Sequence, residues 1–479
     1  MRWCPVRVQY AREAPITTHT SPHHEPAGPR RPSAGRPRAR VRREFLRALG
    51  GLAIGPVHAA GSVLCRAELR AAVARDLATA ATPSEPEPIA LPDRPLRLFL
   101  SCAEPSGETH AVALVRELMN TATAWGAPAP VLTGLGGERL AAAGVRTVGD
   151  PVARAAMGGD ALRSVGFYRA LLERAVEAMD AERVDACIPV DSPALHVPLA
   201  HLAHGSSIPV VHHVTPQYWG WAPWRVAGYR RAVDLALTIL PFEPAWFARH
   251  GVRSAHVGHP QVDALAGVEA PGWGEDSGRT SLVLLPGSRR GVLERNLPFF
   301  LRVLQRVRDT GLDPEVVLPL AKEELAPALA GIDPSARIRV SREPLHAELA
   351  RARVALSVSG TVLLDLLHHR IPTSVVYPAR NGLQRRLQGC ILTVPWFASP
   401  NLLAGREILP ETTHHDGEPA NEVAAGLVRW LTDAEAHAAV RRDLDLAAER
   451  LGPPGAARRA AAHVLRAAVG VLPEPPRRP

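Results

Sequence analysis

The residues best suited to chemistry lie in two short loops of the C-terminal half, each following an apolar run that predicts a β-strand. Small residues in a strand-to-helix turn expose backbone amides, and a helix start with free amides and a hydroxyl stabilises a phosphate. An arginine in the first loop could add a charge-assisted hydrogen bond. Two such loops in one domain indicate a nucleotide diphosphate site. The candidates are Ser288 and Arg289 after residues 281–285, and Ser359, Gly360 and Thr361 after residues 354–358.

Asp365 lies one helical turn beyond the second loop, four residues after Thr361. Its carboxylate could accept hydrogen bonds from ribose hydroxyls beside a bound diphosphate, or serve only the dipole of the helix start. Further along the chain, Asn401, Arg406 and Glu407 offer an amide, a guanidinium and a carboxylate within one short segment.

The N-terminal half contains a comparable turn, in which Glu104, Ser106 and Gly107 lie between a predicted strand at 97–101 and a helix. Turns of this kind meet ligands at the carboxyl edge of a parallel sheet. A glycine-rich loop at 134–137 would let the backbone approach a ligand closely. For both loops, a tight connection that simply needs small residues is an equally good explanation.

A third candidate is the aromatic segment 215–225, where Tyr218, Trp219, Trp221 and Trp224 are interrupted by proline and glycine. This composition predicts a rigid loop rather than a strand. Aromatic faces beside arginine suit a sugar or an acyl chain, although core packing beneath the loop explains them almost equally well.

The elements that must position these residues are short apolar strands that alternate with helices from residue 96 onward. Such alternation predicts parallel sheets with right-handed crossovers, and the segment is long enough for two doubly wound sheets. Proline and glycine between 259 and 279 mark the boundary between them. The predicted strands are 97–101, 129–132, 186–190, 210–213, 235–239, 281–285, 315–318, 354–358 and 373–376, with helices that include 161–179, 362–369 and 421–432.

The charge of the chain is concentrated in its N-terminal tail. Of the net charge of +9 over 479 residues, +8 belongs to the first fifty, which hold 11 Arg against 3 Glu. The remainder is nearly neutral, so a nucleic-acid-binding body is not predicted. The longest nearly apolar run, 48–60, is too short to span a bilayer. The five cysteines are dispersed, and the adjacent histidines at 212–213, 368–369 and 414–415 give no convincing ligand set, so no metal site is predicted.

Residues 1–94 form a basic, Pro/Arg-rich extension that ends in a proline-rich linker at 82–88. Arg42 and Arg43 precede the small apolar run and resemble a twin-arginine export signal. The alternative is an amphipathic helix that leads into a second helix at 67–79.

Ten short segments follow one another along the folded part of the chain. They are A-E-P-S-G-E (103–108), G-L-G-G-E-R-L (134–140), M-G-G-D-A-L (157–162), V-D-S-P (190–193), P-Q-Y-W-G-W (216–221), L-P-F-E (240–243), G-H-P (258–260), L-L-P-G-S-R (284–289), S-G-T (359–361) and P-N-L-L-A-G-R-E (400–407). Together they resemble, in order, the motifs of bacterial lipid-A-disaccharide synthase. The family implies an α/β fold of two Rossmann-like domains facing a cleft, called GT-B. We expect an acceptor-side domain at 95–258, a UDP-sugar-binding domain at 259–440 and a C-terminal helix and tail at 441–479.

The resemblance assigns roles position by position. Glu104, Ser106 and Gly107 would line the acceptor side, and Asp191 falls in the acidic motif that serves catalysis. The nucleotide part, UDP, would be bound by Ser288, Arg289, Ser359, Gly360, Thr361, Asp365, Asn401, Arg406 and Glu407.

The chain departs from the family in that acidic motif. The usual pattern, D-A-P-D-F-N, has a second acid and an Asn where this chain has Ala194 and His196. The first loop ends in Glu108 instead of the usual Asp, and Asp365 stands where the family usually has Glu.

The implied reaction joins UDP-2,3-diacylglucosamine to 2,3-diacylglucosamine 1-phosphate by direct displacement with inversion. A side chain must take the proton of the attacking hydroxyl. Asp191 is the first candidate for this base, followed by His196 and Glu108. The scheme requires no metal and no cofactor. Another UDP-sugar enzyme of the same architecture, such as a UDP-N-acetylglucosamine 2-epimerase, and a diverged nucleotide-sugar-binding protein both remain open.

The acylated substrates imply a cytoplasmic protein attached peripherally to the inner face of the inner membrane. Helix 161–179 mixes apolar and basic residues, as an interfacial helix does, although an ordinary amphipathic helix packed on the sheet is at least as consistent with the spacing. The arginine-rich tail could add attraction to anionic lipid. An oligomer is left open.

Overall fold

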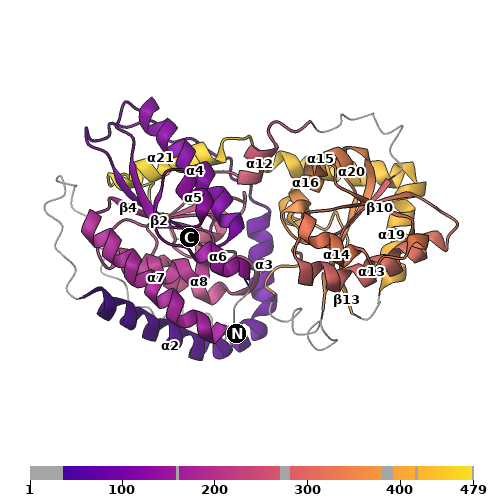
Figure 1. Ribbon diagram of the computed structural model, residues 1–479, viewed down its shortest axis with the longest axis horizontal. Coiled ribbons are helices and arrows are strands. Elements are labelled where there is room, and N and C mark those ends of the chain that lie inside the picture. Colours follow the sequence, from indigo (N-terminus) through magenta and orange to yellow (C-terminus); the bar gives the residue numbers. More distant parts are fainter. Residues whose placement is uncertain (1–35, 158–160, 270–280, 380–391, 416–418, 477–479) are drawn as a thin grey trace. The chain divides into compact units, whose positions relative to one another are not determined.

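The computed structural model describes residues 36–157, 161–269, 281–379, 392–415 and 419–476. The chain divides into two compact units: unit 1 contains residues up to Asp263 together with Pro453 onward, and unit 2 contains Ala264–Gly452 (Figure 1). Each unit is built on one parallel sheet with helices on both faces, so the predicted α/β class with two Rossmann-like domains is confirmed.

Unit 1 has a seven-stranded sheet in the order β3-β2-β1-β4-β5-β6-β7. Helices α4 and α21 lie on one side of it and α7 and α8 on the other (Figure 1). The strands are β1 (Arg97–Cys102), β2 (Val131–Leu135), β3 (Arg146–Gly149), β4 (Ala186–Val190), β5 (Val211–His213), β6 (Leu235–Thr238) and β7 (Ser254–His256). The helices after β1 are α4 (Pro105–Ala124), α5 (Glu138–Ala142), α6 (Pro151–Met157), α7 (Ala161–Glu182), α8 (Pro193–His204), α9 (Tyr218–Trp221), η1 (Pro223–Arg225), α10 (Val226–Arg230), α11 (Glu243–Arg249), α12 (Pro260–Leu265) and α21 (Ala456–Ala468).

Unit 2 has a six-stranded sheet in the order β10-β9-β8-β11-β12-β13. Its apolar core joins this sheet to α13 and α19. The strands are β8 (Ser281–Leu285), β9 (Glu315–Pro319), β10 (Ile338–Ser341), β11 (Ala352–Val358), β12 (Thr373–Pro378) and β13 (Glu411–His414). The helices are α13 (Arg290–Arg308), η3 (Glu323–Leu325), α14 (Ala326–Leu329), η4 (Pro334–Ala336), α15 (Leu345–Arg351), α16 (Val362–His368), α18 (Ser399–Ala404), α19 (Ala420–Thr432) and α20 (Ala434–Glu449).

The N-terminal extension contains two helices, α2 (Pro37–Leu64) and α3 (Arg66–Leu77), as the helical alternative to an export signal predicted. Helix α2 packs on α7 and α8, where the buried Arg40 forms an ion pair with Asp180 at 2.8 Å. Helix α3 packs on α11 through an ion pair between Asp76 and Arg249. This part of the extension therefore belongs to unit 1. The tail of residues 1–35 and positions 158–160 of the M-G-G-D-A-L motif lie outside the described residues.

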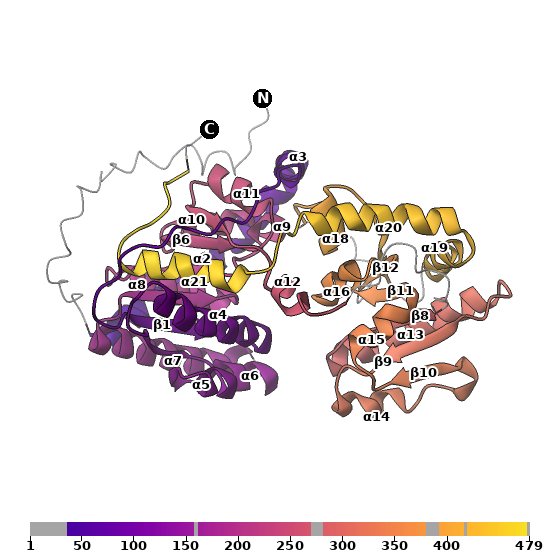
Figure 2. The same ribbon diagram turned by 90° about the horizontal axis from the view of Figure 1, so that it is seen from above.

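The end of the chain returns to unit 1. Helix α21 lies beside α4 (Figure 2) and contributes Ala460, Val464 and Leu465 to the core under the first sheet. The chain passes from unit 1 to unit 2 after Asp263, shortly beyond the expected boundary at 258. Helix α20 continues past residue 440, where the second domain was expected to end.

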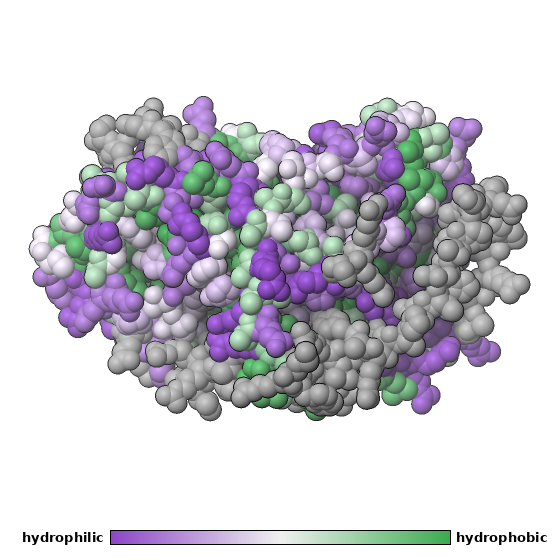
Figure 3. All heavy atoms as spheres, turned by 180° about the vertical axis from the view of Figure 1, so that it is seen from behind, coloured by the Kyte–Doolittle hydropathy of each residue, from purple (hydrophilic) through white to green (hydrophobic). Residues whose placement is uncertain are grey.

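Within the described residues, no helix combines the length and apolarity needed to cross a bilayer. Hydrophilic and hydrophobic side chains are interspersed on the face drawn in Figure 3.

Candidate active site

Two loops of unit 1 meet at the carboxyl edge of its sheet, where parallel α/β sheets bind ligands. Gly107 lies in the first turn of α4, the helix that follows β1, and Asp191 directly follows β4. A Cβ placed on Gly107 would lie 3.7 Å from the Asp191 Cβ and 3.4 Å from the Val190 carbonyl oxygen. The two segments that the sequence singled out are therefore in close contact, and residue 107 has little room for a larger side chain.

Asp191 and Ser192 occupy a left-handed backbone turn, with φ values of 58° and 43°. Each non-glycine residue in this region costs roughly 1–2 kcal/mol, so neighbouring groups must hold it. The Asp191 amide donates to the His213 carbonyl at 2.9 Å. Burial raises the pKa of the Asp191 carboxyl, while a hydrogen bond from the Ser192 amide opposes that shift. The result is a half-buried carboxylate presented on a fixed turn.

His196 lies in α8 behind this turn and is fully buried. Its Nδ1 lies 2.6 Å from the Asp191 carbonyl oxygen and its Nε2 lies 2.9 Å from the Ser101 hydroxyl. Burial lowers the pKa of His196 to about 4. Both ring nitrogens are occupied within the protein, so this arrangement does not favour the expected second candidate as a base.

Glu108, the third candidate base, is also buried. Its Oε1 accepts a hydrogen bond from the Leu140 amide at 3.1 Å and lies against Gly137. The carboxylate therefore ties the first loop to the glycine-rich loop at the start of α5. Glu104 is half-buried and Ser106 is exposed at the start of α4, where both side chains are open to a ligand.

The aromatic segment divides into a core part and a surface part. Trp219 is buried, and its indole Nε1–H donates to Glu243 at 3.1 Å. Burial raises the pKa of Glu243 to about 7. Trp221 is exposed, with the Arg225 guanidinium 5.1 Å from its ring centre. Core packing thus explains Trp219, whereas Trp221 is available to a ligand.

In unit 2, Ser288 and Arg289 lie exposed at the start of α13, directly after β8. Gly287 has a φ of 128°, and a Cβ there would collide with Val292. The loop therefore needs glycine to turn back over the first turn of α13. Its free amides and Arg289 form a basic helix start that suits a phosphate.

The second loop of unit 2 joins β11 to α16. Ser359, Gly360 and Thr361 are exposed, and a Cβ on Gly360 would meet no atom within 4 Å. Asp365 is buried in α16 one turn later. Ser359 and Thr361 are thus exposed at the surface, whereas Asp365 is buried.

The segment around α18 differs from expectation. Asn401 is fully buried: its amide group donates to the Leu409 carbonyl and Glu411, and its oxygen accepts from the Ile408 and Leu409 amides, all at 2.8 Å. Internal partners use every hydrogen-bonding position of this side chain, so its role is structural. Arg406 is exposed and paired with Asp443 at 2.5 Å, and Glu407 is exposed.

Glu411 and Tyr377 are central to this region, and no sequence motif points to Glu411. The Glu411 carboxylate accepts hydrogen bonds from the Phe397 and Ala398 amides at 2.8 and 2.9 Å, from Asn401 and from the Tyr377 hydroxyl at 2.8 Å. The Ser359 hydroxyl in turn is hydrogen-bonded to Tyr377. These contacts connect the loop after β11 to the start of α18.

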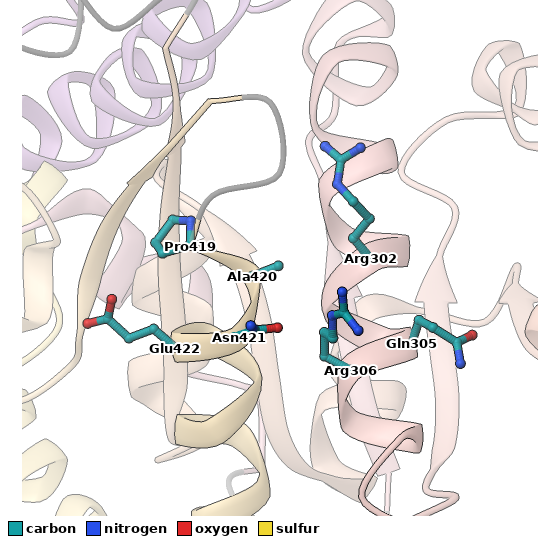
Figure 4. Close-up of a pocket in the computed structure, with 7 residues that line it drawn as sticks. All are labelled: Arg302, Gln305, Arg306, Pro419, Ala420, Asn421 and Glu422. Carbon is teal, nitrogen blue, oxygen red and sulfur yellow. The ribbon is translucent and has the colours of Figure 1, made fainter.

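A pocket of about 470 Å³ opens between α13 and the start of α19. Figure 4 shows Arg302 and Arg306 on one wall and Asn421 on the other. The two arginines are exposed and Arg306 pairs with Asp309. None of the predicted site residues lines this pocket.

Two buried histidines of unit 1, His212 and His213, lie beside the Asp191 turn. Burial lowers their pKa values, and that of the half-buried His259, to about 3. Among the residues that the structure describes, no group of three or more histidine, cysteine or acidic side chains is arranged to hold a metal ion.

Comparison with known proteins gives a consistent result over the folded body. A family model described as lipid-A-disaccharide synthetase matches residues 98–459. The lipid-A-disaccharide synthase of Myxococcus xanthus is 33% identical over 388 residues, covering 78% of this chain and 97% of that protein. The corresponding enzyme of Trichlorobacter lovleyi is 31% identical, covering 78% and 97%. Among solved structures, Staphylococcus aureus MnaA with UDP has a TM-score of 0.50 at 13% identity, covering 80% of this chain and 99% of that chain, which supports the fold alone.

Proposed function

Because the chain belongs to the lipid-A-disaccharide synthetase family and is therefore a glycosyltransferase, we propose that it transfers 2,3-diacylglucosamine from its UDP derivative to 2,3-diacylglucosamine 1-phosphate. The products are the lipid A disaccharide 1-phosphate and UDP. The observation that carries this proposal is the match over residues 98–459, which includes the Asp191 turn in unit 1 and both helix-start loops in unit 2.

Asp191 is the base in this proposal. As the 6-hydroxyl of the acceptor attacks the anomeric carbon, its proton passes to the Asp191 carboxylate and the bond to the UDP oxygen breaks, with inversion at that carbon. Two observations support this choice: burial raises the pKa of Asp191, which strengthens it as a base, and Ala194 removes the other acid of the motif.

The UDP site comprises the exposed loops of unit 2. The α13 amides and Arg289 would stabilise the negative charge that grows on the leaving diphosphate, and the loop 359–361 would supply hydroxyls. Asp365 would bind ribose. Arg406 would leave its ion pair with Asp443 to bind the nucleotide, and Glu407 would bind beside it. Asn401 supports the site from within the protein as a positioning residue.

The acceptor site lies at the start of α4. Glu104 and Ser106 are open to a ligand there, and Gly107 keeps the approach to Asp191 clear. Glu108 fixes the two loops to each other instead of acting on the substrate.

The protein is proposed to act in the cytoplasm while attached peripherally to the inner membrane. Helix α2 supports this location because Leu46, Val57 and Leu64 are 59%, 70% and 80% exposed. They are spaced by 11 and 7 residues, about three and two helical turns, and therefore lie on one face. Arg42 and Arg43 flank this face. An outward strip of apolar and cationic side chains suits anionic lipid.

The decisive experiment supplies radiolabelled UDP-diacylglucosamine and the lipid acceptor to the purified full chain. We expect a disaccharide product that is lost in Asp191→Asn. Asp150→Asn is the matched control, because Asp150 caps α6 through the Ala153 amide at 2.9 Å and asparagine can do the same.

Two results would overturn the proposal. UDP binding without product from the wild-type chain would identify a nucleotide-sugar-binding protein. A free epimerised sugar nucleotide would identify a different UDP-sugar enzyme.

A further inference from the structure

We infer that His196 and His212 are positioning residues that together hold Asp191 in its left-handed turn through hydrogen bonds to the Asp191 carbonyl oxygen. The inference rests on the proposed role of Asp191. It assigns a function to the histidine that replaces the family's asparagine and to a second histidine from the neighbouring strand.

The geometry fixes the direction of both hydrogen bonds. The Asp191 carbonyl oxygen lies 2.6 Å from His196 Nδ1 and 3.1 Å from His212 Nε2. A carbonyl oxygen only accepts, so both ring nitrogens must carry a proton. Burial lowers the pKa values of the two rings, which are therefore neutral at pH 7. The other nitrogen of each ring is consequently an acceptor, and the Ser101 hydroxyl donates to that of His196.

The parts come from neighbouring strands at the centre of the sheet. Ser101 lies in β1, Asp191 follows β4, and His212 lies in β5. These three strands are neighbours in the sheet, in the order β1-β4-β5. The Asp191 amide is also fixed, by its hydrogen bond to the His213 carbonyl. Both backbone groups of Asp191 are thus held from the adjacent strand and from α8, and the side chain is left to project beside Gly107.

His196 does more than fill space in the core. Its Nδ1 is hydrogen-bonded to the turn at Asp191 and its Nε2 to Ser101 in β1, so the ring connects the turn to that strand. The rings of His196 and His212 also meet edge to face, with centres 6.1 Å apart. Removing either donor would let residues 191–192 relax toward ordinary backbone angles and move the carboxylate. A displacement of about 1 Å can reduce turnover on the order of 100-fold.

The test compares His196→Ala and His212→Ala with donor-preserving variants. An asparagine amide can imitate Nδ1 and a glutamine amide can imitate Nε2, so His196→Asn and His212→Gln should recover activity. We expect kcat to fall at least about tenfold in each alanine variant, with KM for the UDP-sugar changed less than about twofold, because the nucleotide loops belong to unit 2. His250→Ala is the control, since the buried His250 follows α11 and its Nδ1 is hydrogen-bonded to the Trp246 carbonyl at 2.7 Å, one turn earlier in the same helix.

A crystal structure of the double alanine variant provides a readout independent of activity. Loss of the left-handed angles at residues 191–192 supports the inference, and their retention overturns it. Equal kcat losses in His250→Ala and His196→Ala would also overturn it. An inactive wild-type chain would instead refute the proposed function, while the structure of the variant would still decide the role of the histidines.

Discussion

Replacing Glu411 tests whether one carboxylate organises the segment around α18. Its two oxygens accept hydrogen bonds from two backbone amides, one side-chain amide and one phenol. In Glu411→Ala, the Phe397 and Ala398 amides lose their acceptor inside a partly buried region. In Glu411→Gln, the shape is kept but one oxygen becomes an NH₂ group that must face at least one of these donors.

The expected loss of stability follows from the number of donors. Hydrogen bonds to a charged acceptor contribute roughly 1.5–3 kcal/mol each, and a buried donor left unsatisfied costs about 1–3 kcal/mol. Because Glu411 is only half-buried, water compensates part of the loss. We therefore expect Glu411→Ala to destabilise unit 2 by about 3–5 kcal/mol, Glu411→Gln by about half as much, and Tyr377→Phe by about 1 kcal/mol.

Hydrogen exchange of the full chain is the appropriate assay, because a chain with two units need not unfold in one step. The amides of Phe397 and Ala398 report directly on the lost contacts. Glu324→Ala is the control, since Glu324 is exposed and should change the stability of unit 2 by less than about 0.5 kcal/mol. Unchanged exchange at residues 397–398 in Glu411→Ala would show that the carboxylate does not organise this segment.

Three further outcomes are expected. Arg289→Ala should weaken UDP binding about 10- to 100-fold by calorimetry without changing stability, because Arg289 is exposed; an effect no larger than that of Arg295→Ala would contradict the phosphate role. Gly134→Ala should prevent folding of unit 1, because a Cβ there overlaps the Leu100 carbonyl oxygen, whereas Gly166→Ala in α7 meets nothing within 4 Å and should be neutral or stabilising by thermal unfolding. Acid should destabilise unit 1 below pH 6.5, because burial lowers the pKa of His196 to about 4 and those of His212 and His213 to about 3. The unfolded chain therefore takes up protons at a higher pH than the folded chain, and each histidine should lower the free energy of unfolding by about 1 kcal/mol between pH 6.5 and 5.5. Denaturation at a series of pH values measures this loss. A flat pH profile over that range would contradict this account.

The strands predicted from the apolar pattern of the sequence are the interior strands of both sheets. Those it missed, β3, β7, β10 and β13, are the four edge strands. Interior strands such as β4 and β8 are buried along their whole length and therefore have continuous apolar runs. The edge strands are only partly buried, so their sequences lack such runs. The physical cause of the error is therefore exposure at the edges.

Local sequence located the candidate loops but not the partners of the candidate side chains. The loops at 288–289 and 359–361 are exposed at helix starts, as the small residues and hydroxyls predicted. By contrast, Asn401 and His196 look like ligand-binding residues until tertiary contacts show that internal groups occupy them. Glu411 could not have been identified, because its donors include backbone amides, which have no sequence signature.

The return of α21 to the first core has a consequence for synthesis on the ribosome. Ala460, Val464 and Leu465 of α21 complete a core whose first strand begins at Arg97, so unit 1 cannot close until α21 has left the exit tunnel. Unit 2 is one uninterrupted stretch, Ala264–Gly452, and can therefore fold while unit 1 still waits for its final segment. A stop codon before Ala456 would thus damage the unit that was translated first.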